Sequence, residues 1–421
     1  MKVAVIGAGT AGLCSAHRLL EQGLSCVVFE RGSELGGTWI YTDDTGLDEY
    51  GLPIHTSMYK SLRTNLPKEA MGFPDFPIPA QKASYIPARD ILNFLNLYAD
   101  HFKLREHIKF NHYVELIKPT KDDKWEIKAK DLTTKKTVIE IFDAVMVCNG
   151  HYHAPFIPQI HNKDIFKGPQ IHSHDYRKPD PYTNARVLVL GAGPSGMDIA
   201  LEVASVAKHV TLSHRMKRVP RTVFPKNMTM VVKEVTEILE DGAKFEDGSI
   251  EKFDIILYCT GYLYSFPFLS PECGITVSEN YVQPLYKHLV NIERPTMALI
   301  GIPFYVCAAQ MFDLQIRFVV EYLCGKFQLP SKEEMRADTE RDMQKRWARG
   351  DSKRKAHIMG PDQEAYYNDL ATTAGITPIS PVMTKMHNDS SERFLDELDK
   401  FRDDVYKIVD EENFECEYKY I

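Results

Sequence analysis

A pattern of strand, glycine turn and helix occurs twice along this chain of 421 residues and constrains its fold more than any other feature. The first copy covers residues 3–22 and the second covers residues 187–204. In such a unit the first glycine permits a tight turn, the second admits a pyrophosphate to the backbone, and the third allows the helix to pack on the strand. The sequence therefore predicts an α/β protein with two Rossmann-like dinucleotide-binding domains.

The first copy is followed by a second strand pattern at residues 25–29, which ends in Glu30. A carboxylate at this position can accept hydrogen bonds from both hydroxyls of a nucleotide ribose. The start of the helix offers unpaired N–H groups to the phosphates. We expect the phosphates to lie against the loop residues Gly7, Gly9, Thr10, Ala11 and Gly12.

The second copy ends differently, because its second strand pattern runs into His214 and Arg215. A carboxylate would repel a 2′-phosphate there, whereas an arginine can bind one through two parallel hydrogen bonds. Lys217 and Arg218 add positive charge, so this copy is predicted to prefer NADPH over NADH; a solvated surface arginine is the alternative. The expected contacts are Gly191, Gly193, Pro194, Ser195, Gly196, Asp198, Ser213 and Arg215.

The remaining segments suggest how the two copies are arranged. Residues 143–150 and 254–261 are apolar strands that each run into a glycine, so each is expected to complete one nucleotide-binding sheet. Alternating segments between Val114 and Glu140 predict a small antiparallel addition. We predict an FAD-binding domain at 1–176, an inserted NADPH-binding domain at 177–283, and a second part of the FAD domain, with C-terminal helices, at 284–421.

Composition argues against several classes of function. The net charge is −7 and no long basic run is present, which argues against nucleic-acid binding. The eight cysteines include no Cys-x-x-Cys pair, which argues against a zinc site and a disulfide reductase. The histidine pairs at 151/153 and 172/174 have no third ligand at a suitable spacing, so no metal is expected.

No membrane anchor is expected. Residues 296–312 are apolar but read as a strand at 297–302, a loop and the start of a helix, and residues 392–412 are charged at helical spacing. The chain opens directly with a strand pattern, which predicts a soluble, cytoplasmic protein without a signal peptide. Secretion stays open, for a chain from which a signal peptide was removed.

Several further segments together resemble the flavin-containing monooxygenases. Residues 166–176 match the FxGxxxHxxxY pattern of that family, residues 34–39 match its second glycine element, and residues 61–69 and 259–262 match its active-site segment and its later threonine-glycine turn. The chain looks more like the soluble insect members than like the vertebrate pattern, and some of those insect members N-oxygenate plant pyrrolizidine alkaloids. Related Baeyer–Villiger enzymes usually end the pattern in tryptophan, so Tyr176 favours oxygenation of a heteroatom.

The resemblance implies a reaction. NADPH would reduce FAD, dioxygen would add at carbon 4a, and the hydroperoxyflavin would transfer one oxygen atom to a nucleophilic nitrogen or sulfur of a small molecule. N-oxide formation on a tertiary-amine plant alkaloid is one such reaction, in keeping with detoxification. A Baeyer–Villiger enzyme acting on ketones, a non-oxygenating flavoprotein reductase and a non-catalytic nucleotide sensor are the alternatives, and a homo-oligomer is left open.

The resemblance also assigns residues. Asn65 would be catalytic, its amide holding NADP or a water beside the peroxide; an ordinary turn asparagine is the alternative. A helix beginning near Ala309 would direct its positive end at the flavin, and the substrate pocket would include residues near Tyr262, Phe304 and Phe312. The further cofactor contacts would be Leu35, Gly36, Gly37, Thr38, Trp39, Thr64, Leu66, Val114, Thr260, Gly261 and Gln310.

Overall fold

The computed structural model describes residues 1–216, 218 and 220–419, and its largest element is a seven-stranded sheet. The strand order is β18-β19-β20-β7-β1-β2-β3, and the five strands from β20 to β3 are parallel. Antiparallel pairs join β18 to β19 and β19 to β20. The strands are β1 (Lys2–Ile6), β2 (Ser25–Phe29), β3 (Ile108–Lys109), β7 (Ala144–Val147), β18 (Leu285–Tyr286), β19 (Val290–Asn291) and β20 (Met297–Leu299).

The two faces of this sheet carry different layers, as the alternation of side chains along a strand dictates. Val3 and Val5 of β1 pack in one core with three helices, whereas Ala4 and Ile6 face a small antiparallel sheet that contains Trp125. The helices are α1 (Thr10–Glu21), α2 (Ala88–His101) and α4 (Ala308–Leu323). The small sheet, expected between Val114 and Glu140, consists of β4 (His112–Pro119), β5 (Trp125–Asp131) and β6 (Thr137–Phe142).

A second sheet of five parallel strands has the order β11-β10-β9-β15-β8. Helix α3 (Pro194–Ala204) packs on one face, and a three-stranded sheet of β12 (Val235–Leu239), β13 (Gly242–Phe245) and β14 (Ile250–Lys252) covers the other. Its strands are β8 (Gln170–His172), β9 (Arg186–Leu190), β10 (His209–Ser213), β11 (Met228–Val231) and β15 (Ile255–Tyr258). In the chain, four strands of the first sheet precede residue 170 and three follow residue 258. The second Rossmann-like unit is therefore inserted within the sequence of the first.

The two apolar segments before glycines take equivalent places. Strand β7 pairs with β1, and β15 pairs with β9, so each lies beside the strand that enters a glycine loop. The apolar segment at 296–312 forms β20, a loop and the start of α4, as expected. In the part of the chain that is described, no helix is long and apolar enough to cross a membrane.

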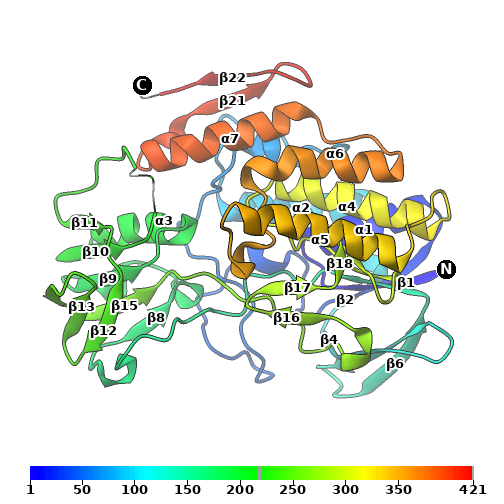
Figure 1. Cartoon of the computed structure of the whole chain (residues 1–421), viewed down its shortest axis with the longest axis horizontal. Helices are drawn as coiled ribbons and strands as arrows, with labels where there is room; N and C mark the ends of the chain where they lie inside the picture. Colours follow the sequence, from blue (N-terminus) through cyan, green and yellow to red (C-terminus); the bar gives the residue numbers. More distant parts are fainter. Residues whose placement is uncertain (217, 219, 420–421) are drawn as a thin grey trace.

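The C-terminal region contains three helices and a hairpin that together bridge the two sheets (Figure 1). The prediction of helical spacing over residues 392–412 is wrong beyond Asp396, where α7 ends. The following segment pairs in an antiparallel hairpin, in which Tyr406 lies opposite Cys416, so its backbone hydrogen bonds are those of a strand. The elements are α5 (Lys332–Ala348), α6 (Gln363–Ala374), α7 (Pro381–Asp396), β21 (Val405–Ile408) and β22 (Phe414–Glu417); a further hairpin consists of β16 (Thr276–Ser278) and β17 (Tyr281–Gln283).

Candidate functional site

The first glycine loop joins β1 to α1 through a turn that only glycine fits. Gly7 has a φ of +104°, a conformation that side chains rarely adopt. A Cβ atom on Gly12 would lie 1.8 Å from the carbonyl oxygen of Gly7, so the third glycine is required for α1 to approach the strand. Thr10 and Ala11 form the first turn of the helix, whose free N–H groups can bind a phosphate.

The second glycine element lies against this loop. The Gly36 N–H donates to the Ala8 carbonyl at 3.0 Å, and a Cβ atom on Gly37 would lie 3.0 Å from the Cα of Gly9. The hydroxyl of Thr38 is buried and has no hydrogen-bond partner among the described residues, although its carbonyl accepts from Thr56 at 2.8 Å. Leu35 is buried beside these residues and Trp39 packs partly against the same core.

Glu30 is buried where β2 ends, and both of its carboxylate oxygens accept backbone hydrogen bonds. The Ala8 N–H donates to one oxygen and the Gly32 N–H to the other, each at 2.7 Å. Burial raises the pKa of this carboxyl, and the two backbone N–H groups oppose that shift. Each oxygen keeps a second lone pair, so the carboxylate can still accept from ribose hydroxyls. Together with the unpartnered Thr38 hydroxyl and the close glycines, these residues fit FAD.

The second glycine loop repeats the geometry of the first. Gly191 has a φ of +101°, and a Cβ atom on Gly196 would lie 1.8 Å from the Gly191 carbonyl oxygen. A Cβ atom on Gly193 would meet nothing within 4 Å, so the space beside this glycine is open. Pro194 and Ser195 form the first turn of α3, where proline loses no hydrogen bond. This loop therefore also fits the pyrophosphate of a dinucleotide.

The structure places Arg215 where it follows β10, with its side chain 74% exposed and ion-paired with Glu234. The nearby Arg218 pairs with Asp396 of α7 at 2.7 Å, and Lys217 lies outside the described residues. Ser213, at the end of β10, donates from its hydroxyl to the Lys233 carbonyl at 2.5 Å. A 2′-phosphate at this position would therefore compete with Glu234 for the guanidinium of Arg215.

Asn65 lies in a bend whose backbone is fixed from two sides. Ser390 of α7 donates to the Asn65 carbonyl at 3.2 Å. The carbonyl of the preceding Thr64 accepts from Arg402, and the Thr64 N–H donates to the Ile86 carbonyl. The Asn65 side chain is exposed, and no hydrogen bond to its amide is found among the described residues. Leu66, which follows, is half-buried. The amide is thus free to meet a ligand.

Several predicted contacts turn out to hold the protein together. Asp198 forms an ion pair with Arg402 at 2.6 Å and accepts a hydrogen bond from Tyr59, so its carboxylate already has protein partners. Gln310 is buried and donates to the Gly72 carbonyl at 2.8 Å. Val114 is buried in β4 at the point where the pairing with β5 shifts register.

The later threonine-glycine turn is tied to the family-identifying pattern. The Thr260 hydroxyl donates to the Phe156 carbonyl, and the ring of His172 is 3.1 Å from the Gly261 carbonyl. His172 is also hydrogen-bonded to the backbone N–H of His174 at 3.0 Å. The histidine of the pattern therefore positions the turn after β15.

An aromatic cluster includes Tyr262, which was predicted to lie near the substrate pocket, together with four residues that were not predicted as a site. It consists of His55, His151, Tyr152, His153 and Tyr262. The rings of His55 and His153 stack with centroids 5.2 Å apart, and those of Tyr152 and Tyr262 lie edge to face at 5.5 Å. Burial lowers the pKa of His55 to about 3 and that of His151 and His153 to about 4, so these rings are neutral at physiological pH.

The aromatic cluster could not be found from spacing because its members come from three separate segments. The sequence offered two separate signals: the His151/His153 pair, for which no third metal ligand was found, and Tyr262, which was predicted for the substrate pocket. His151 Nε2 and His153 Nδ1 are buried without a hydrogen-bond partner in the described residues, as expected of groups that face a ligand. Phe304 lies 6.2 Å from His151 between ring centroids, whereas Phe312 packs against Gly301.

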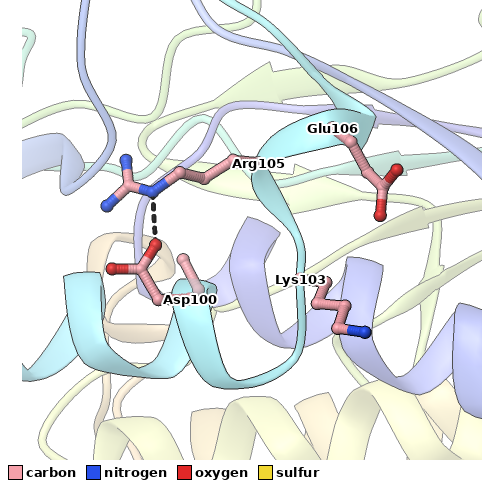
Figure 2. A pocket seen from close by; sticks show the side chains of 5 residues that line it. Asp100, Lys103, Arg105 and Glu106 are labelled. Atoms are coloured by element: carbon pink, nitrogen blue, oxygen red, sulfur yellow. Dashed lines mark hydrogen bonds and ion pairs between the residues drawn. The ribbon is translucent and has the colours of Figure 1, made fainter.

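Two surface hollows lie away from these loops. Figure 2 shows one of about 250 Å³ at the end of α2, lined by Ala99, Asp100, Lys103, Arg105 and Glu106, where Arg105 and Asp100 pair at 2.5 Å. A second of about 360 Å³ lies between α5 and α6. Among the described residues, no group of three or more histidine, cysteine, aspartate or glutamate side chains could hold a metal ion. All eight cysteines are free, and six are buried.

Comparison with known proteins agrees with this geometry. A model of the family described as flavin-binding monooxygenase-like matches residues 1–233 and 217–390. Senecionine N-oxygenase from Tyria jacobaeae is 34% identical over 99% of this chain and 92% of the relative, and the flavin-containing monooxygenase GS-OX5 from Arabidopsis thaliana is 38% identical over 96% and 91%. The structure of S-allyl-L-cysteine S-oxygenase from Allium sativum is 34% identical, with a TM-score of 0.89 over 96% of this chain and 94% of that one.

The chain belongs to the flavin-binding monooxygenase-like family. It is a flavoprotein monooxygenase, and FAD and NADPH are its cofactors. The structure has two Rossmann-like units, as predicted. The structure of cyclohexanone monooxygenase, at 15% identity and a TM-score of 0.63, shares the fold.

Proposed function

We propose that this protein transfers one oxygen atom from dioxygen to a nucleophilic nitrogen or sulfur atom of a small molecule, with a tertiary amine as the first substrate class to test. The observation that carries the proposal is the placement of Asn65. Its backbone is bonded to α7 and, through Thr64 and Arg402, to α3 of the second glycine loop, while its amide has no partner among the described residues. The N-oxygenase and S-oxygenase relatives support this substrate range.

The residues divide the work of binding. The loop at Gly7–Gly12 and the carboxylate of Glu30 would hold FAD, and the loop at Gly191–Gly196 with Arg215 would hold NADPH. When bound, these cofactors supply the hydride and the activation of dioxygen. The Asn65 amide would donate a hydrogen bond to NADP or to a water in the active site, and this bond would slow the release of hydrogen peroxide by the enzyme.

The aromatic cluster suits an amine or sulfide. Its histidines stay neutral because burial holds their pKa values near 3 to 4, so they do not repel a base that arrives as a cation. Tyr152 is 48% exposed and presents an aromatic face, which attracts cations and apolar groups alike. We propose this cluster as part of the route by which the substrate reaches Asn65.

Isotope labelling tests the proposed function. The purified protein is given NADPH, ¹⁸O₂ and, in separate reactions, a tertiary amine, a sulfide and a cyclic ketone. An N-oxide or sulfoxide that carries one ¹⁸O atom is the expected product. An ester from the ketone, with no product from the amine or the sulfide, would instead identify a Baeyer–Villiger enzyme. Oxidation of NADPH without any oxygenated product would identify a reductase.

A further inference from the structure

A partly buried ion pair connects the second glycine helix to the loop that carries Asn65. Arg402 donates from both terminal nitrogens to the two oxygens of Asp198, at 2.6 and 3.0 Å. The side chains are 17% and 14% exposed, so water screens the pair only weakly. Asp198 lies in α3, two residues after the third glycine of the loop.

The same guanidinium also holds the loop. The Nε–H of Arg402 donates to the Thr64 carbonyl at 3.1 Å, directly before Asn65. In return, the Arg63 guanidinium donates to the Arg402 carbonyl at 3.0 Å. A lysine could keep the charge, but it could not reproduce this fork and the third bond together.

Helix α3 contacts the loop at a second point, one turn further along. Glu202 accepts from Ser61 at 2.5 Å and from Tyr176 at 2.8 Å, while Tyr59 donates to Asp198. Residues four apart lie on one face of a helix, so Asp198 and Glu202 form a continuous acidic face of α3 against residues 59–65. Arg402 is the cation that neutralises this face from the C-terminal region.

We propose that Arg402 is a positioning residue that couples the NADPH-binding helix α3 to the Asn65 loop, so that the C-terminal region completes the active site. The inference rests on the proposed function, because it assigns a purpose to the Asn65 loop. Without the guanidinium, Asp198 becomes a negative charge without a cation in the helix that receives the pyrophosphate, and the Thr64 carbonyl loses its hydrogen bond while the Thr64 N–H keeps its bond to Ile86. The first change weakens nucleotide binding, and the second loosens the bend at Asn65, whose carbonyl then depends on Ser390 alone.

Arg402→Met is compared with Arg393→Met as a matched control. Arg393 lies in the same C-terminal region and pairs with the buried Asp404 at 2.8 Å, a pair that joins α7 to residue 404 rather than to α3. For each variant we measure the melting temperature, the FAD content, the NADP⁺ dissociation constant from the flavin absorbance, and the peroxide released per NADPH consumed. Arg402→Lys is measured as the conservative variant.

The Arg402→Met variant is expected to bind NADP⁺ about fivefold more weakly or worse, a typical size for coupling between sites, and to release more peroxide. Arg393→Met should lower the melting temperature without either effect. Arg402→Lys should recover most of the NADP⁺ affinity, because the charge on Asp198 is again paired, and less of the peroxide retention. This split between the two readouts would not arise from a merely structural role.

Equal NADP⁺ affinity and equal peroxide release in Arg402→Met and Arg393→Met would overturn the inference. If Arg402→Met does not fold, an Arg402→Lys variant with unchanged peroxide release and NADP⁺ affinity would overturn it too. Failure of the proposed function is recognised separately, because a wild-type protein that forms no oxygenated product can still be titrated with NADP⁺. A weaker NADP⁺ complex in Arg402→Met would then support the coupling without the oxygenation.

Discussion

Asn65 sits in an exposed bend between the buried residues Thr64 and Pro67, so a change in its side chain should leave the fold intact. We expect Asn65→Ala to bind FAD with normal stoichiometry but to release several times more peroxide per NADPH, because the amide hydrogen bond is lost. A lost hydrogen bond to a charged group costs about 1.5–3 kcal/mol, or roughly ten- to a hundredfold in a rate ratio. A peroxide assay alongside NADPH absorbance checks this, and unchanged coupling would make Asn65 a plain turn residue.

Arg215 and Glu234 give a second prediction at this scale. Arg215→Ala should raise the KM for NADPH by about tenfold or more while leaving the KM for NADH nearly unchanged, since only NADPH carries the phosphate. Glu234→Gln should act in the opposite sense, because the carboxylate no longer competes for the guanidinium. Steady-state kinetics with both cofactors decide the matter, and equal losses with NADPH and NADH in Arg215→Ala would remove the assigned role.

Single residues also show where prediction from the sequence succeeds. The glycine turns could be predicted because each glycine is required by residues close to it in the chain. A Cβ atom on Gly12, for example, would lie 1.8 Å from the carbonyl oxygen of Gly7. The ion pair of Asp198 could not be predicted, because its partner Arg402 is 204 residues away in the chain and no sequence pattern connects the two. The pairing of Arg215 with Glu234 was hidden for the same reason.

At the scale of elements, a substitution in one glycine loop should impair the binding of one cofactor and leave the binding of the other intact. In Gly12→Ala and Gly196→Ala the new methyl group collides with a backbone carbonyl, so the helix must shift at a cost of about 1–3 kcal/mol or more. Gly12→Ala should be purified with little FAD. Gly196→Ala should keep FAD but be reduced slowly by NADPH.

Gly193→Ala provides the matched control, because a Cβ atom there meets nothing within 4 Å. Its melting temperature should equal that of the wild type, while its NADPH affinity falls because the methyl group occupies the space of the pyrophosphate. The flavin-to-protein absorbance ratio and the rate of anaerobic reduction report both effects. Loss of FAD from Gly196→Ala would contradict the assignment of the two loops.

Elements with a strong local pattern were predicted well. The strands β1 and β9, the helices that follow them, and the β4–β6 sheet all form where expected, because apolar periodicity and glycine turns are local signals. The β21–β22 hairpin was missed because charged residues on an exposed strand face mimic a solvated helix. Tyr406 is buried in the same core as residues of β9 and α3, and this contact holds the segment in place as a strand.

The whole molecule should lose stability as the pH falls through the range of its buried histidines. The pKa values of His55, His151 and His153 are about 3 to 4, below the ordinary value of 6.5. Between pH 6.5 and 4 the unfolded chain therefore binds protons that the folded protein does not. Each such proton lowers the free energy of unfolding by at most about 1.4 kcal/mol per pH unit, and partial exposure of the rings reduces this figure.

Melting temperatures at pH 7.5 and pH 5, at constant ionic strength, measure this dependence. The double variant His55→Gln/His153→Gln should show a smaller drop than the wild type, since two of the proton-binding groups are gone. A variant of the exposed His161 should behave as the wild type does. An identical drop in all three proteins would mean that other groups control acid unfolding.

The insertion of one sheet within the other also sets an order on synthesis. Every strand of the second sheet lies between residues 170 and 258, whereas β7 must wait for β20, whose residues begin at Met297, to cover its free edge. When about 260 residues have emerged from the ribosome, every strand of the second sheet is available, whereas the first sheet still has one bare side. A nascent chain held at that length exposes the edge of β7 to aggregation and to chaperones until β20 follows.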